Sequence, residues 1–127
     1  MAVLSKILYV EDEPSIRTIA QIALEAVGGF VLRTCESGQQ ALAPESIAFA
    51  PDIILLDVMM PDMDGPTTLL RMRQIDAFAA TPVVFMTAKV QASEVEEYLA
   101  LGALGVIPKP FDPMTLSQQL RDIWNGR

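Results

Sequence analysis

The chain has 127 residues, 51% of them hydrophobic, which suits one domain built around a single core. A lone cysteine, Cys35, rules out an internal disulfide, and the lack of any histidine rules out zinc clusters and Ser-His or Cys-His catalytic pairs. The net charge of −7 disfavours direct binding to nucleic acid and no apolar run reaches the roughly 18 residues that span a membrane, so we expect one cytoplasmic domain over residues 1–127.

Five short aliphatic runs predict β-strands. They lie at residues 7–10, 30–32, 53–56, 83–86 and 104–107. The third and fourth runs are apolar at every position, as expected of strands that helices cover on both faces. Stretches with helical periodicity separate the runs, so strand and helix alternate along the whole chain.

The first helix is predicted over residues 14–27. Pro14 occupies the first helical position, where a backbone N–H is not needed, and Gly28-Gly29 follows the last turn. The buried face of this helix is predicted to carry the apolar residues Ile16, Ile19, Ala20, Ala23 and Val27.

The second helix is predicted to be short or kinked. Ser37 can cap it, but Pro44 would interrupt its interior. The last helix is predicted to have Asp112 as its N-cap and Pro113 as its first residue. This last helix is predicted at residues 112–125, and the two helices before it at residues 66–77 and 91–101.

This alternation predicts an α/β fold. Repeated strand-helix units give parallel strands joined by right-handed crossovers, and the helices then pack on both faces of a doubly wound sheet. Ligands in such sheets bind beyond the carboxyl ends of the strands. The residues at those ends are therefore the first candidates for a functional site.

Polar side chains stand at the ends of four predicted strands. Glu11 and Asp12 follow the first strand, Asp57 the third, Thr87 the fourth and Lys109 the fifth. Three carboxylates brought together repel one another by ~4 kcal/mol per pair at 4 Å, so the cluster needs positive charge. Mg²⁺ is the natural source, because it is hard, prefers oxygen and binds one or two carboxylates together with phosphate oxygens.

Asp57 is the best nucleophile of the group, because it stands alone at its strand end whereas Glu11 and Asp12 are neighbours suited to a metal. Lys109 offers a cation on the side opposite the metal, and Thr87 offers a hydroxyl donor for a phosphoryl oxygen. The set suits transfer of a phosphoryl group to a carboxylate.

Four motifs carry a resemblance to a known family. They are Ile-Leu-Tyr-Val-Glu-Asp-Glu at 7–13, Leu-Leu-Asp-Val-Met-Met-Pro-Asp-Met-Asp-Gly at 55–65, Met-Thr-Ala at 86–88 and Lys-Pro-Phe at 109–111. In their order and spacing the chain resembles the receiver domains of two-component response regulators, over essentially its whole length. The resemblance implies a flavodoxin-like or CheY-like five-stranded parallel sheet in the order 2-1-3-4-5.

The resemblance also implies a role for each matching residue. Asp57 is similar to the phosphoacceptor of the family, and Thr87 and Lys109 to the residues that contact the phosphoryl group and switch the domain. The Mg²⁺ ligands it implies are the side chains of Glu11, Asp12 and Asp57 and the backbone carbonyl of Met59. In the family the bond before the proline that matches Pro110 is commonly cis.

The implied function is that of a phosphorylation-dependent signalling switch, with no enzyme activity beyond its own phosphorylation and dephosphorylation. The phosphoryl group would come from a phosphohistidine on a sensor histidine kinase or a histidine phosphotransfer protein, because this chain has no histidine of its own. The resemblance places the surface for a downstream protein partner on the helix 91–101, the strand 104–107 and the helix 112–125. Output then occurs through protein contacts, or the chain is a piece of a longer protein.

Three positions depart from the family pattern. Val106 stands where many receivers carry an aromatic residue that turns inward on phosphorylation, Glu11 replaces the commoner aspartate, and Pro108 lies inside the fifth strand, which an edge strand tolerates. The valine favours an alternative, a pseudo-receiver that acts as a phosphorylation-independent interaction module. The complete set of acids, threonine and lysine favours the active receiver.

Other interpretations fail on spacing. Residues 62–65 look like part of a calcium loop, but aligning the glycine puts Met60 and Arg71 where that loop needs acids. A dehalogenase-like phosphatase needs a second acid where Met59 stands. A flavin-binding relative needs a phosphate loop after the first strand, where the acidic residues 11–13 would repel the phosphate.

Met59 and Lys89 flank the expected phosphorylation site, at positions that in the family influence the access of water to the acyl phosphate. An apolar Met59 should not help to orient water. We therefore expect slow self-hydrolysis of the phosphorylated domain.

Overall fold

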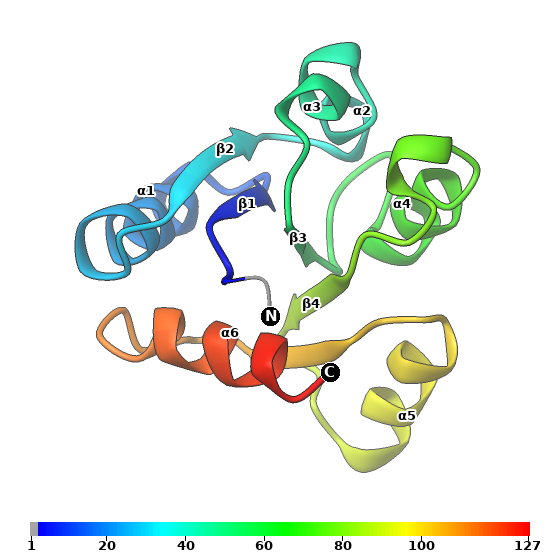
Figure 1. The fold of residues 1–127 in the computed structure, drawn as a ribbon. Coiled ribbons are helices and arrows are strands. Elements are labelled where there is room, and N and C mark those ends of the chain that lie inside the picture. Colours follow the sequence, from blue (N-terminus) through cyan, green and yellow to red (C-terminus); the bar gives the residue numbers. More distant parts are fainter. Residues whose placement is uncertain (1–2) are drawn as a thin grey trace.

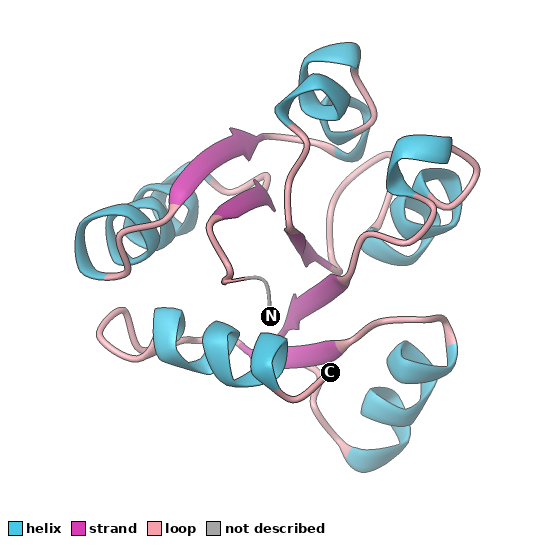
Figure 2. Ribbon diagram, in the orientation of Figure 1, coloured by secondary structure: helices cyan, strands magenta, loops and turns pink. Residues whose placement is uncertain are grey.

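The structure, a computed structural model, describes residues 3–127 as a parallel five-stranded sheet in the order β2-β1-β3-β4-β5. This is the order that the family resemblance implied. Figures 1 and 2 show the strands at the centre of the molecule, with helices around them. The strands are β1 (Lys6–Val10), β2 (Val31–Cys35), β3 (Ile53–Asp57), β4 (Val83–Thr87) and β5 (Gly105–Pro108).

The helices of the described chain are mostly short. They are α1 (Pro14–Ile22), the π-helix η1 (Ala23–Val27), α2 (Gly38–Ala41), α3 (Pro44–Phe49), α4 (Gly65–Met72), the 3-10 helix η2 (Asp76–Phe78), α5 (Ala92–Ala100) and α6 (Leu116–Asn125). Between residues 3 and 127, none of them is both long and apolar enough to cross a membrane.

Two apolar clusters pack on opposite faces of the sheet. One joins α1, η1 and α6 to the sheet through residues such as Ala20, Leu24, Leu120 and Trp124. The other joins α2, α4 and α5 to the opposite face. Every residue of β3 and β4 is buried, because helices cover both faces of these two strands.

The first helix is confirmed, but its buried face is only partly the predicted one. Ala20 and Ala23 are fully buried, whereas Ile19 and Val27 are each 47% exposed, and Leu24 is buried in their place. Leu24 belongs to the same face as Ala20, one turn further along, whereas Ile19 lies at the edge of that face; Val27 ends the π-helical last turn, Ala23–Val27.

Contacts from α6 accompany that π-helical turn. Ser117 Oγ donates a hydrogen bond to the Ala23 carbonyl over 2.9 Å, and the Arg121 guanidinium donates to the Gly28 carbonyl. The predicted Gly28-Gly29 stop is confirmed, since Gly29 has a φ of 74°, which favours glycine.

The predicted break in the second helix is confirmed. The segment divides into α2, which Ser37 caps by accepting from the N–H of Gln40, and α3, in which Pro44 is the first residue. Proline is harmless at that position because the first N–H groups of a helix have no partner within it.

Two helix boundaries were predicted wrongly. The helix expected at 66–77 ends at Met72, and Ile75 is extended. The Arg73 guanidinium stabilises the turn that follows by donating to the carbonyls of Phe78 and Thr81. The last helix begins at Leu116 instead of Pro113, with Thr115 in the N-cap position that was predicted for Asp112. Asp112 instead caps a preceding turn, by accepting from the N–H of Met114.

Candidate functional site

The site lies where β1 and β3 end side by side. Val10 and Leu56 are paired in the sheet, so the next residues, Glu11 and Asp57, come out at the same edge. The Glu11 N–H still bonds to the Cys35 carbonyl of β2, at 3.0 Å, and thereby extends the ladder past the strand. Glu11 and Asp57 are only 1% and 2% exposed, so two carboxylates are held in the interior.

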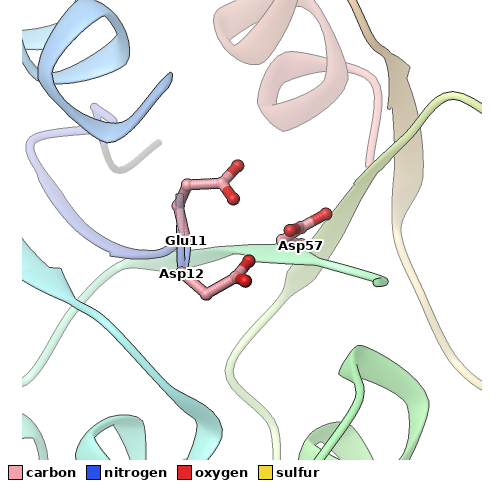
Figure 3. A group of neighbouring side chains, drawn as sticks. All are labelled: Glu11, Asp12 and Asp57. Atoms are coloured by element: carbon pink, nitrogen blue, oxygen red, sulfur yellow. The ribbon is translucent and has the colours of Figure 1, made fainter. Parts of the chain in front are cut away.

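Three acidic side chains converge there. Each of Glu11, Asp12 and Asp57 offers a carboxylate oxygen within 4.8 Å of the others, and Figure 3 shows the three carboxylates around one space between the strand ends. Asp12 is the half-buried member and leaves the cluster open to solvent on its side. The sequence prediction that these acids come together is confirmed, and their spacing could hold a metal ion.

Lys109 supplies a positive charge within this cluster. Its Nζ lies 2.6 Å from Glu11 Oε1 and 3.0 Å from Asp57 Oδ1. The Lys109 N–H bonds to the Thr87 carbonyl at 2.8 Å, and the Lys109-Pro110 peptide is cis, as expected. The lysine was expected on the side opposite the metal, but in the structure it also contacts Glu11, one of the acids expected to hold that metal.

Burial and hydrogen bonding have opposite effects on the pKa values of Lys109 and Glu11. Burial raises the pKa of Glu11 above its usual range, although the hydrogen bond from Lys109 works against that rise. Burial alone would lower the pKa of Lys109, but the hydrogen bonds to Glu11 and Asp57 outweigh it and raise the pKa overall. Lys109 is therefore a cation at neutral pH, and it offsets part of the charge of the acids.

Tyr9 is a neighbour that the sequence interpretation missed. This residue of β1 is fully buried, and its hydroxyl lies 3.5 Å from Glu11 Oε1. Burial raises the pKa of the Tyr9 phenol well above its usual range, so the phenol keeps its proton and can donate it in a hydrogen bond. The signal was available, because residues two apart in a strand point to the same face and Glu11 follows Tyr9 by two.

Most of the chain matches one known protein family. A family model described as the response regulator receiver domain matches residues 7–121. The chain belongs to the response-regulator receiver family. Receivers are the phosphoacceptor domains of two-component systems, in which response regulators pair with histidine kinases.

Individual relatives of this receiver agree with the assignment. The transcriptional regulatory protein TrcR of Mycobacterium tuberculosis is 33% identical over 118 residues, which make up 93% of this chain and 44% of TrcR. The regulatory protein AtoC of Escherichia coli is 36% identical over 115 residues, which are 88% of this chain and 23% of AtoC. The chain thus spans less than half the length of these two curated relatives.

Solved receiver structures match the fold over nearly the whole chain. The chemotaxis response regulator CheY4 of Vibrio cholerae superposes with a TM-score of 0.85 at 32% identity, covering 95% of this chain and 99% of CheY4. The five-stranded order and the placement of the helices are therefore those of a CheY-like receiver.

The remaining site residues of the receiver lie around the acids. Thr87 is buried at the end of β4, and its hydroxyl accepts from the Lys89 N–H at 3.0 Å. Met59 is 62% exposed beyond β3, and Lys89 is also exposed. Val106 pairs with Phe85 in the sheet and packs, half-buried, against the cluster on the α5 side.

Proposed function

We propose that Asp57 of this receiver accepts a phosphoryl group from a phosphohistidine of a histidine kinase or phosphotransfer protein, with the help of Mg²⁺. The observation that carries the proposal is the contact of Lys109 Nζ with both Glu11 and Asp57, at 2.6 and 3.0 Å. A fixed cation beside a buried carboxylate can stabilise the negative charge that a phosphoryl group brings to that carboxylate.

The transfer proposed is an in-line displacement. An oxygen of Asp57 attacks the phosphorus, the bond from phosphorus to the donor imidazole breaks, and its electron pair returns to the imidazole nitrogen. Lys109 donates to an oxygen of the transferred group, and the Thr87 hydroxyl, which accepts from the Lys89 N–H and still has its own proton to give, donates to another. The acyl phosphate that forms on Asp57 keeps these two contacts.

The residues present suit a divalent cation. Three carboxylates with oxygens within 4.8 Å carry three negative charges, and the single ammonium of Lys109 leaves two of them unbalanced. We assign Glu11, Asp12 and Asp57 as the side chains that would hold Mg²⁺, together with the backbone carbonyl of Met59. When bound, the ion neutralises charge and orients phosphoryl oxygens.

An apolar hollow beside Lys109 suits the approach of the donor protein. It lies between α1 and the segment that follows β5, and its walls are formed by Ile16, Ile19, Lys109, Pro110, Phe111 and Pro113. A donor helix seated there would bring its phosphohistidine next to the acids. We further propose that residues 1–127 form one cytoplasmic receiver domain, of which residues 1 and 2 lie outside the described part.

The output surface proposed is formed by α5, β5 and α6, which correspond to the fourth helix, fifth strand and fifth helix of the family. β5 is an edge strand, as predicted, and it links Lys109 directly to this surface. Because Val106 is aliphatic, the movement of Thr87 and Lys109 toward the phosphoryl group would have to be transmitted by backbone shifts and not by an aromatic rotamer.

Incubation with acetyl phosphate and Mg²⁺ tests the proposed acceptor. We expect the intact mass of the wild-type protein to rise by the mass of one phosphoryl group, and the Asp57→Asn variant to stay unmodified, because an amide oxygen is a poor nucleophile. Asp52→Asn is a matched control, since Asp52 caps the start of the strands at the opposite edge of the sheet.

Two outcomes would sink the proposal: no added mass on the wild type, or the same addition on Asp57→Asn. The first of these would favour the pseudo-receiver, for which the comparisons give no support.

A second prediction concerns the lifetime of the phosphoryl group. Met59 is exposed beside the site but has no group that can orient water. We expect Met59→Asn to lose its phosphoryl group roughly tenfold faster than the wild type, less than the ~100-fold that a positioned general base supplies. The measurement is the decay of phosphorylated mass after removal of the donor, with Met114→Asn, also exposed, as control. An unchanged decay in Met59→Asn would contradict the expectation.

A further inference from the structure

Tyr9 places a hydroxyl in the middle of an otherwise apolar core. The residue is fully buried in β1, among cluster members such as Ile7, Leu55 and Met86. A buried phenol needs a partner for its hydroxyl, because an unpaired one costs free energy that an aliphatic side chain would not. The acceptor that the structure supplies is Glu11 Oε1, at 3.5 Å.

Glu11 is held by three donors. Lys109 Nζ and the Tyr9 hydroxyl both lie against Oε1, at 2.6 and 3.5 Å, and the Glu13 N–H donates to Oε2 at 3.3 Å. Of the three, Lys109 is shared with Asp57 and the Glu13 N–H belongs to the loop before α1. The Tyr9 hydroxyl is the donor that comes from inside the sheet and serves Glu11 alone.

The contact depends on the length of the side chain at position 11. Glu11 carries one methylene more than the aspartate that is commoner at this position of the family, and its carboxylate can therefore turn back over β1 toward Tyr9. A tyrosine in β1 and a glutamate two residues later on the same face form a matched pair.

We propose that Tyr9 is a positioning residue that holds the Glu11 carboxylate in place for the metal and so sets the Mg²⁺ affinity of the receiver. The inference rests on the proposed function, since it assumes that Glu11 belongs to the metal site. Groups that orient a metal ligand without touching the metal typically contribute a factor of about 10 to 100 to its affinity.

The test is a cycle of four proteins: wild type, Tyr9→Phe, Glu11→Asp and the double variant. Phenylalanine keeps the ring and loses only the hydroxyl. Titration with MgCl₂ by calorimetry should show about tenfold weaker binding for Tyr9→Phe, the low end of the usual range because the contact is long. In the Glu11→Asp background the same change should have no effect, because the shorter carboxylate does not reach position 9.

A matched control is Tyr98→Phe, which removes the same hydroxyl from a ring buried on the opposite face of the sheet, against Phe85. Its Mg²⁺ affinity should equal that of the wild type.

Urea unfolding of the four proteins of the cycle, without metal, is a second measurement. It should show that the effects of Tyr9→Phe and Glu11→Asp on the free energy of unfolding are not additive, because the two side chains touch.

Additive effects on metal-free unfolding would overturn the contact. Unchanged Mg²⁺ affinity in Tyr9→Phe, or an equal loss in both backgrounds, would reduce Tyr9 to a packing residue and overturn its positioning role. If the wild type itself binds no Mg²⁺, all five proteins give the same flat titration. That result contradicts the metal in the proposed function and overturns the role of Tyr9 with it, and it differs visibly from a failure of Tyr9 alone.

Discussion

Replacing Lys109 with methionine is expected to slow phosphorylation of this receiver by acetyl phosphate about a hundredfold, the usual effect of losing one donor to a developing charge. Methionine keeps most of the aliphatic stem and loses the ammonium that lies 3.0 Å from Asp57 Oδ1 and 2.6 Å from Glu11 Oε1. The phosphoryl oxygens would then meet two buried carboxylates with no fixed cation between them. The rate of mass gain at saturating Mg²⁺ measures the effect.

Lys6→Met is the matched control, because it removes the same charge from the start of β1, at the opposite end of that strand from Glu11. We expect its phosphorylation rate to stay within about twofold of the wild type, as surface charges interact weakly with the site through solvent. Circular dichroism should show both variants folded. Equal rates for Lys109→Met and the wild type would remove Lys109 from the proposed mechanism, and equal slowing by both variants would mean that only net charge matters.

The central sheet could be predicted because its pattern is local. The runs 53–56 and 83–86 are apolar throughout, and they became the fully buried strands β3 and β4. The run 30–32 was placed too early, since β2 extends over Val31–Cys35. The polar residues Arg33 and Thr34 suggested that the strand had ended before them. However, β2 is an edge strand, and an edge strand accommodates polar side chains that a central strand would not.

The errors in the helices have a tertiary origin. The π-helical turn at the end of the first helix coincides with contacts from Ser117 and Arg121, more than ninety positions away in sequence. The last helix starts three residues late because Asp112 satisfies the N–H of Met114 in a turn. An Asp-Pro pair marks the start of either a helix or a turn, and sequence alone does not distinguish the two.

The members of the site could be predicted, but their pairing could not. Strand ends put Glu11, Asp12 and Asp57 at one edge, as the convergence of the three carboxylates confirms. Which acid Lys109 contacts depends on side-chain length and on the path of the chain after β5. The role of Tyr9 was not predicted, because an aromatic residue inside an apolar strand suggests packing before it suggests a hydrogen bond.

Replacing Gly65 with alanine is expected to destabilise the receiver by about 2–3 kcal/mol, as overpacking of a close contact does. A β-carbon at this first residue of α4 would lie 2.5 Å from the Asp57 carbonyl oxygen and 2.9 Å from Val58 Cα. Both are backbone atoms, and the Gly65 N–H bonds to the Val58 carbonyl, so the two backbone segments cannot separate without losing that hydrogen bond. Helix propensity alone predicts the opposite sign, since alanine favours a helix over glycine by about 1 kcal/mol.

The strain would fall on the backbone of Asp57 itself, so Gly65→Ala should also slow phosphorylation. A misplacement of about 1 Å at a reacting group can cost about a hundredfold in rate. Gly126→Ala is the matched control, because a β-carbon there meets nothing closer than the Asp122 carbonyl oxygen at 3.3 Å. Urea unfolding and the rate of mass gain give the two readouts. Wild-type stability together with a wild-type rate in Gly65→Ala would show that the loop between β3 and α4 can move away from Asp57 without disturbing the acceptor.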